Sequence, residues 1–254
     1  FLSGGIDSSS VVAAMSRLGD QPVKTFSIGF TDPRFDESPY ARQVAALYGT
    51  DHHERIVNPE IFQELLPRVI WHLDEPFGDV SFLPMLAISQ LARESVTVVL
   101  TGDGGDELFA GYTKYCDFLA KHQSGLAGAD PGPAPSTGTG PGFSREAVAQ
   151  VYVNSTAVFS QSLKDRLTAN GLGCAVASTD STPVFARWFK EVQTGNILDM
   201  LLYADLRSLL NDNNVVKPDR MAMAVSLEAR SPYLDPRMIN LALSIPSGLK
   251  FKDG

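Results

Sequence analysis

The sequence has little cysteine, a deficit of basic residues and no long hydrophobic run. Its 254 residues include only two cysteines, Cys116 and Cys174, which makes a disulfide framework improbable and favours a reducing, cytoplasmic setting. No apolar stretch reaches the roughly 20 residues of a membrane-spanning helix. The net charge of −8 argues against nucleic acid as the main partner, because phosphate backbones are bound by lysine and arginine clusters.

The composition is that of a folded globular protein. Hydrophobic residues make up 44% of the chain, enough for a sizeable core. The first residues, Phe1 to Gly5, lack an initiator methionine and read like the last residues of a β-strand. We therefore expect the chain to be part of a longer protein.

The first half of the chain alternates two kinds of apolar pattern. Runs rich in β-branched and aromatic residues predict strands at 23–30, 52–57 and 96–100, and helical spacing predicts helices at 8–18, 37–48, 59–73 and 84–93. The run 96–100 (VTVVL) does not alternate, as expected for a strand buried on both faces. Strands separated by helices imply right-handed crossovers and a parallel sheet, so we expect a doubly wound α/β core.

The second half departs from this pattern. Residues 124–142 consist mostly of glycine, proline, alanine, serine and threonine, which predicts a flexible surface loop. From residue 143 onward we expect helices, including 198–210 and 238–243, and no strand. The predicted organisation is an α/β core at 1–123, the loop at 124–142, and a helical part of the same domain at 143–254.

The strongest local pattern is the glycine- and serine-rich stretch Leu2–Ser9, between a strand end and a helix. Glycine lets the backbone approach an anion closely, and the N–H groups of the first helical turn then point at that anion. Asp7 would repel bare phosphate, so its presence favours a bound Mg²⁺. No Gly-Lys-Ser/Thr follows, which excludes a Walker A motif. The alternative is a structural turn in which a serine caps the helix.

A second glycine-rich stretch, Thr101–Tyr112, follows the predicted strand 96–100. It contains Asp103, Asp106 and Glu107 within five residues. Ligands of open α/β sheets bind at the carboxyl ends of strands. Clustered carboxylates repel one another and need a metal or another cation to stay ionised. The alternative is that these aspartates only cap the following helix.

Four motifs occur in a fixed order: LSGGIDSS (2–9), DEPFGDVSFLP (74–84), VLTGDGGDELFAGY (99–112) and DRMAMAVSLEARSPYLD (219–235). Together they resemble the synthetase domain of the glutamine-hydrolysing asparagine synthetases, whose fold is of the PP-loop ATP pyrophosphatase type. The resemblance covers nearly the whole chain except about residues 113–195. It implies a nucleotide-binding core and a C-terminal helical extension.

The resemblance also implies roles for individual residues. Asp7 and Asp106 match positions that hold Mg²⁺, and Asp103 matches the acidic residue associated with forming β-aspartyl-AMP, where some asparagine synthetases have glutamate. Glu228 and Arg230 match a catalytic Glu-x-Arg on the helical side of the site. The implied ATP-binding residues are Leu2, Ser3, Gly4, Gly5, Asp7, Ser8, Ser9, Ile28, Thr101 and Gly102.

The activity implied by the resemblance is ATP-dependent adenylation of the aspartate β-carboxylate, followed by amidation with ammonia. The ammonia would come from glutamine through a glutaminase domain outside these residues, and homodimer formation stays open. Two alternatives remain: a β-lactam-synthetase-like or other amide-forming enzyme acting on a different carboxylate, and a non-catalytic ATP-binding relic. Lys217 and Arg220 could supply positive charge near phosphate or could belong to a solvated helix start.

The composition of residues 124–142 leads to a first prediction. Replacing them with a short Gly-Ser loop should leave the affinity for ATP unchanged, because a flexible surface loop contributes few contacts. Isothermal titration of ATP·Mg²⁺ into both proteins measures this. A large loss of affinity would show that the segment covers the nucleotide.

Overall fold

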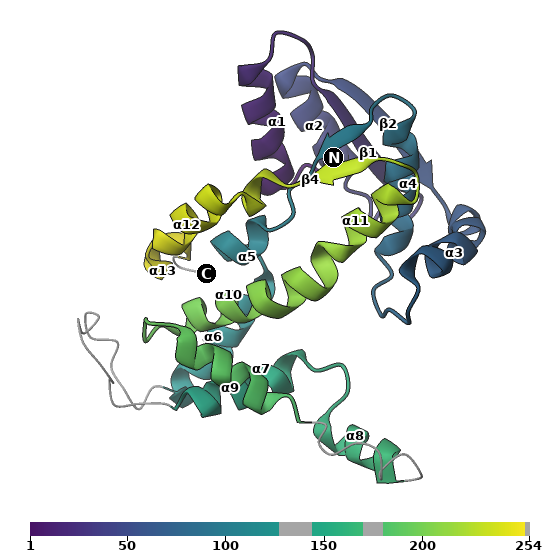
Figure 1. Cartoon of the computed structure of the whole chain (residues 1–254). Coiled ribbons are helices and arrows are strands. Elements are labelled where there is room, and N and C mark those ends of the chain that lie inside the picture. Colours follow the sequence, from purple (N-terminus) through teal and green to yellow (C-terminus); the bar gives the residue numbers. More distant parts are fainter. Residues whose placement is uncertain (127–143, 170–179, 252–254) are drawn as a thin grey trace. The chain divides into compact units, whose positions relative to one another are not determined.

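The computed structural model describes residues 1–126, 144–169 and 180–251, and the chain divides into two compact units (Figure 1). The first unit contains residues 1–108 and 208–244, and the second contains residues 109–207 and 245–254. The first unit is therefore discontinuous in sequence. The predicted organisation, with an α/β core ending at residue 123 and a helical part starting at residue 143, stays a prediction.

The first unit combines short parallel strands with helices. Its strands are β1 (Lys24–Phe30), β2 (Asp51–Val57), β3 (Val98–Leu100) and β4 (Glu228–Arg230). Its helices are α1 (Ile6–Leu18), α2 (Ser38–Tyr48), α3 (Pro59–Leu73), α4 (Phe82–Arg93), α5 (Gly105–Phe109), the π-helix η2 (Leu206–Asn214), α11 (Val216–Met223), the 3₁₀-helix η3 (Pro232–Leu234) and α12 (Pro236–Ser244), of which α5 and η2 cross the boundary to the second unit.

The structure confirms a mixed α/β fold with parallel strands, but it shows two small sheets in place of the predicted doubly wound sheet. β1 pairs with β2, and β3 pairs with β4. Phe1 and Leu2 lie between the two pairs: the Phe1 nitrogen donates to the Leu100 oxygen at 2.7 Å, and the Leu2 nitrogen to the Phe26 oxygen at 2.9 Å. These two residues form one backbone hydrogen bond with each side, and the Leu2 oxygen also accepts a hydrogen bond from Ser27 Oγ of β1.

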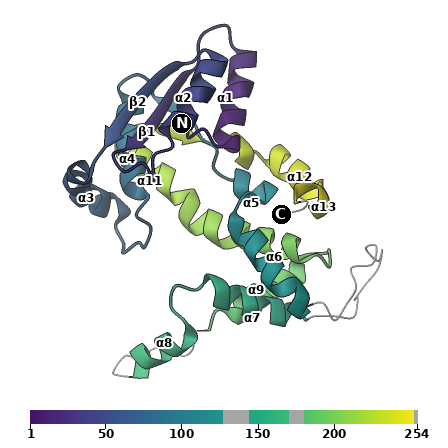
Figure 2. The same cartoon turned by 180° about the vertical axis from the view of Figure 1, so that it is seen from behind.

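The core of the first unit consists of separate apolar clusters. Phe26 and Val99 pack with residues of α4, α11 and β4, so the two sheets share one cluster. Leu2 instead packs with residues of α1 and α2, which lie side by side in Figure 2. α3 packs against α4 and α11 around Phe82 and Leu86. The packing of these helices thus holds the ends of β1 and β3, and the chain around Leu2, in place.

The strand β4 corrects our expectation of helices alone after residue 143. Its three residues, Glu228–Arg230, are too few and too polar to show a strand period in sequence. They form a strand because β3 offers an open edge, where Val98 pairs with Glu228 and Leu100 with Arg230. The predicted helix 198–210 also differs, since α10 ends at Asp205 and a π-helix continues to Asn214.

The described part of the second unit is helical. Its helices are α6 (Thr113–Leu126), α7 (Arg145–Thr156), α8 (Gln161–Leu167), α9 (Thr182–Glu191), α10 (Ile197–Asp205) and α13 (Ser247–Lys250). α6 runs to Leu126, three residues into the predicted loop, and the rest of that loop lies outside the described residues. Nowhere in the described ranges is a helix both long and apolar enough to span a membrane.

A buried carboxylate joins three helices of the second unit. Asp205 of α10 is fully buried and accepts hydrogen bonds from the hydroxyls of Tyr115 at 2.6 Å and Tyr152 at 2.5 Å, while Lys114 Nζ lies 2.7 Å from Asp205 Oδ2. Burial and the nearby charge of Asp205 raise the pKa of Tyr152, so its hydroxyl stays protonated and donates. Because a buried carboxylate needs such partners, this contact holds α6, α7 and α10 together.

We therefore predict that Tyr152→Phe lowers the free energy of unfolding by about 1–3 kcal/mol, since it removes one donor from a buried carboxylate. Urea denaturation followed by circular dichroism measures the change. The matched control is Tyr203→Phe, which removes a hydroxyl that donates to the exposed Glu191 at 2.5 Å and should change stability by less than about 0.5 kcal/mol. Equal effects of the two substitutions would contradict the role of Asp205.

Candidate functional site

The first glycine-rich segment forms a tight turn at the start of α1. Gly4 has φ +87°, in the left-handed region, and a Cβ atom built on it would lie 2.5 Å from Tyr40 Cβ and 2.6 Å from the Ala41 nitrogen. Both the backbone angle and the close approach of α2 therefore require glycine at this position. The turn carries the chain from Leu2 directly into the helix.

Serine hydroxyls hold this turn from within. Ser3 Oγ and Ser8 Oγ lie 3.0 Å apart, the Ser3 nitrogen donates to Ser8 Oγ at 3.2 Å, and the Gly5 nitrogen donates to Ser3 Oγ at 3.2 Å. The N-cap of α1 is Gly5, and no side chain caps the helix. The alternative of a serine-capped turn is therefore not what the structure shows. The first turn of α1 keeps backbone N–H groups that can bind an anion.

The two glycine-rich segments are in contact with each other. A Cβ atom on Gly102 would lie 2.9 Å from the Ser8 nitrogen and 3.1 Å from Asp7 Cβ. A Cβ atom on Gly105 would collide with the carboxylate of Asp7. The structure thus brings the first glycine-rich segment, Leu2–Ser9, into contact with the acidic loop, Thr101–Tyr112, although the two lie about 100 positions apart in the sequence.

The acidic loop is largely buried at this contact. Burial raises the pKa of Asp103, and the negative charge of Glu107 acts in the same direction, while a hydrogen bond from Thr101 and the charge of Lys217 oppose them. Burial also raises the pKa of Asp7, with a further contribution from Glu107. Asp103 Oδ2 is buried and has no hydrogen-bond partner among the described residues. A buried oxygen without a hydrogen-bond partner is costly, so Asp103 is a candidate for a functional role.

Lys217 supplies positive charge next to this loop, and Arg220 binds backbone oxygens at the end of α3. Lys217 Nζ lies 3.0 Å from Asp79 Oδ2 and acts electrostatically on Asp103. Although burial opposes it, the hydrogen bonds of Ser81 and Lys217 lower the pKa of Asp79 to about 2. Arg220 donates to the Leu73 oxygen at 2.6 Å, at the end of α3, which is a structural role.

The remaining predicted residues lie around the same strand ends. Leu2 is buried in the core, and Ile28 is half-buried on β1, opposite Arg55 of β2. The Thr101 nitrogen donates to the Arg230 oxygen at 2.9 Å. Glu228 and Arg230 lie on β4, a strand within the part of the chain for which we expected helices alone. They form an ion pair at 2.8 Å.

Sequence reasoning did not single out the segment that covers both loops. Ser231 Oγ donates to the Asp103 oxygen at 2.5 Å, the Tyr233 hydroxyl lies 3.5 Å from the Asp7 oxygen, and Leu234 packs against Gly104. These residues belong to the motif 219–235, so the motif itself was the available signal. Their contacts depend on β4 pairing with β3, which the sequence did not predict.

Asp7 and Asp106 suit a Mg²⁺ ion held jointly with phosphate. Asp7 contacts Gly105, the first residue of the short helix that carries Asp106. Mg²⁺ is commonly bound by one or two carboxylates together with substrate phosphates, which is the donor set that Asp7 and Asp106 would offer. Among the described side chains, no three potential ligands converge to form a metal centre without a substrate.

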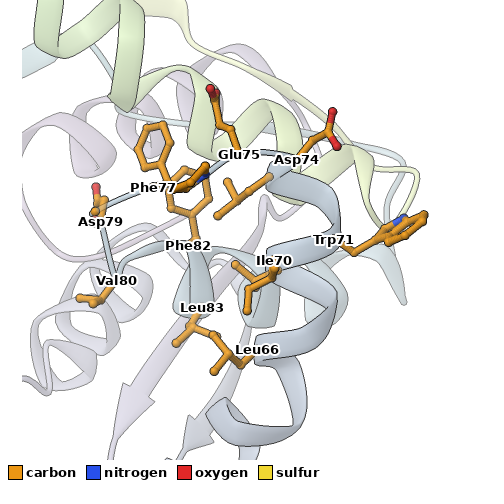
Figure 3. Close-up of a pocket in the computed structure, with 14 residues that line it drawn as sticks. Leu66, Ile70, Trp71, Asp74, Glu75, Phe77, Asp79, Val80, Phe82 and Leu83 are labelled. Atoms are coloured by element: carbon orange, nitrogen blue, oxygen red, sulfur yellow. The ribbon is translucent and has the colours of Figure 1, made fainter. Parts of the chain in front are cut away.

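A cavity of about 740 Å³ lies beside the motif 74–84. α3, the connecting segment and the start of α4 form its walls (Figure 3). The figure shows the acidic side chains Asp74 and Glu75 on one side and the apolar Leu66 and Leu83 on the other. Asp79, the partner of Lys217, also lines this cavity.

Comparison with known proteins identifies the family. Residues 1–254 match the asparagine synthase family, and the chain belongs to it. It is 31% identical to the glutamine-hydrolysing asparagine synthetase 1 of Bacillus subtilis, covering 100% of the chain and 41% of that protein, and 33% identical to a putative glutamine-hydrolysing asparagine synthetase of Mycobacterium bovis, covering 98% and 39%. It is also 24% identical to the amidase chry2 of Gibberella zeae, covering 99% and 43%. The chain thus spans about two fifths of the length of these curated relatives.

The contact at Gly102 yields a prediction. Gly102→Ala would place a methyl group 2.9 Å from the backbone nitrogen of Ser8. The segment Leu2–Ser9 must then shift, at a cost of about 1–3 kcal/mol. We expect the affinity for ATP·Mg²⁺ to fall about tenfold or more, as measured by isothermal titration. Gly195→Ala is the control, because nothing lies within 4 Å of a Cβ atom at Gly195. An unchanged affinity for ATP·Mg²⁺ in Gly102→Ala would show that nucleotide binding does not depend on this contact.

Proposed function

We propose that the chain is the ATP-using synthetase part of a glutamine-hydrolysing asparagine synthetase. In this proposal it transfers the adenylyl group of ATP to the β-carboxylate of aspartate, and ammonia then displaces AMP to form the amide. The observation that supports it best is the contact of Asp7 and Ser8 with Gly102 and Gly105, which joins an anion-binding turn to a carboxylate cluster. Membership of the asparagine synthase family supports the same reaction class.

The chain's residues supply positioning and electrostatics for this reaction. The turn at Ser3–Ser9 binds the β- and γ-phosphates through the N–H groups of α1 and its hydroxyls. Leu2 takes part through its backbone, because its side chain is in the core, and Ile28, Thr101 and Gly102 border the AMP moiety. Such preorganised donors stabilise the departing pyrophosphate without reorganising during the reaction.

The carboxylates divide the remaining tasks. Asp7 and Asp106 hold Mg²⁺, which when bound screens the charge of the phosphates. Asp103, at the end of β3, lies on the side of the α-phosphate and the substrate carboxylate. Glu228 and Arg230 act from β4, next to Thr101.

We also propose one doubly wound sheet in which the segment Phe1–Leu2 joins β1 to β3, as its hydrogen bonds to both strands suggest.

The proposal includes partners outside the chain. Ammonia comes from glutamine through a glutaminase domain, the protein works in the cytoplasm, and the small molecules ATP and aspartate are its other partners. A homodimer is compatible with this proposal.

A second candidate is amide formation on a different carboxylate by the same adenylation chemistry. The similarity to an amidase across 99% of the chain supports this second function. Asp103 supports it as well, because its side chain is one methylene shorter than the glutamate of some asparagine synthetases. Adenylation assayed with aspartate and with bulkier β-amino acids distinguishes the two functions.

The division of tasks between Asp7 and Asp103 predicts different defects. Asp7→Asn should weaken Mg²⁺-dependent ATP binding itself, because it removes a charge that holds the metal against the phosphates. Asp103→Ala should spare ATP binding but slow adenylation roughly 100- to 1000-fold, as for a contact realised mainly in the transition state. ATP titration and aspartate-dependent pyrophosphate–ATP exchange in the full-length protein measure both.

Two results would contradict these assignments. Exchange at the wild-type rate in Asp103→Ala would remove that residue from the chemistry. Normal binding of ATP·Mg²⁺ by Asp7→Asn would make the segment Leu2–Ser9 a structural turn.

A further inference from the structure

The π-helix η2 (Leu206–Asn214) lies directly before the motif 219–235. π-Helical turns are rare and occur frequently at functional sites. The last two residues of this one, Asn213 and Asn214, turn their side chains to different segments of the first unit.

Asn214 contacts the acidic loop. Its Nδ2 atom donates to Glu107 Oε1 at 2.7 Å. Glu107 is 1% exposed and lies on α5, the short helix that follows Asp103 in the chain. A hydrogen bond to a buried carboxylate fixes the orientation of that carboxylate, so Asn214 determines where the charge of Glu107 lies in the acidic loop.

Asn213 contacts the other motif segment. Its Nδ2 atom donates to Asp79 Oδ2 at 3.1 Å, the same oxygen that accepts the ion pair of Lys217. Lys217 lies one turn further along the chain, in α11, and acts on Asp103. One short stretch of helix thus holds a carboxylate of the motif 74–84 and another of the motif 99–112.

We propose that Asn214 is a positioning residue of the adenylation site, which orients the buried Glu107 carboxylate beneath the acidic loop while its neighbour Asn213 fixes the Asp79 segment. This inference rests on the proposed function for its effect on catalysis. The geometry itself is independent of that function, because it requires only the two amide–carboxylate contacts.

The experiment compares Asn214→Ala, Asn214→Asp and the control Asn211→Ala in the full-length protein. Asn214→Asp keeps the size of the side chain but replaces the donor with a second carboxylate facing Glu107. Asn211 is exposed on the same π-helix, and its amide donates to the carboxylate of its neighbour Asp212 at 2.6 Å. Each variant is assayed for pyrophosphate–ATP exchange, ATP affinity and thermal unfolding.

We expect kcat for exchange to fall about 10- to 100-fold in Asn214→Ala, the range for losing a hydrogen bond to a charged group, while KM for ATP changes less than about threefold. Asn214→Asp should be slower still, because like charges then face each other. Wild-type exchange in both variants would overturn the proposal. So would an effect of Asn214→Ala that is undiminished in a protein that also carries Glu107→Ala, because the acceptor of the hydrogen bond is then absent. A loss explained only by packing would make Asn214→Asp the milder variant.

Hydrogen–deuterium exchange of the peptide covering residues 101–112 gives a second readout that needs no activity. The amides of this loop should exchange faster in Asn214→Ala than in the wild-type protein, and their exchange rates should be unchanged in Asn211→Ala. If the wild-type protein forms no labelled ATP, the proposed function fails, and this comparison still decides whether Asn214 positions the loop. Equal exchange in all variants would overturn the positioning role.

Discussion

The close approach of two backbones, Asp7–Ser8 and Gly102–Gly105, is the constraint on which the candidate site depends. The absence of side chains at these glycines lets a helix start and a strand end meet at atomic contact. The surrounding packing serves this contact, since Leu2 anchors the turn on α1 and α2 while Val99 anchors β3 on α4 and α11. A larger residue at either glycine would separate the anion-binding turn from the carboxylates.

The contact also creates the electrostatic character of the site. Asp7 and Asp103 lie in partly buried places, where burial and the negative charge of Glu107 both raise their pKa values. Lys217 offsets part of this charge, and a bound cation would offset more. Such a cluster of buried carboxylates costs free energy unless cations or hydrogen-bond donors compensate its charge.

Sequence reasoning located most elements of the first unit, because helical and strand periods are local properties. The helix 59–73 was predicted with the bounds that the structure shows, and the strands 23–30 and 52–57 differ from β1 and β2 by one residue. It missed β4 and the π-helix. A three-residue polar strand has no period of its own, and it exists only where another strand offers hydrogen bonds.

The sequence by itself determined the α/β class with parallel strands, the family, and the residues of both glycine-rich loops, since ordered motifs and local patterns are carried by the chain directly. Only the tertiary structure decided that Gly102 touches Ser8, that Ser231 and Tyr233 cover the loops, and that Asn214 holds Glu107. These contacts join segments up to 226 positions apart. Their partners are chosen by packing and hydrogen bonding between elements, which no local pattern encodes.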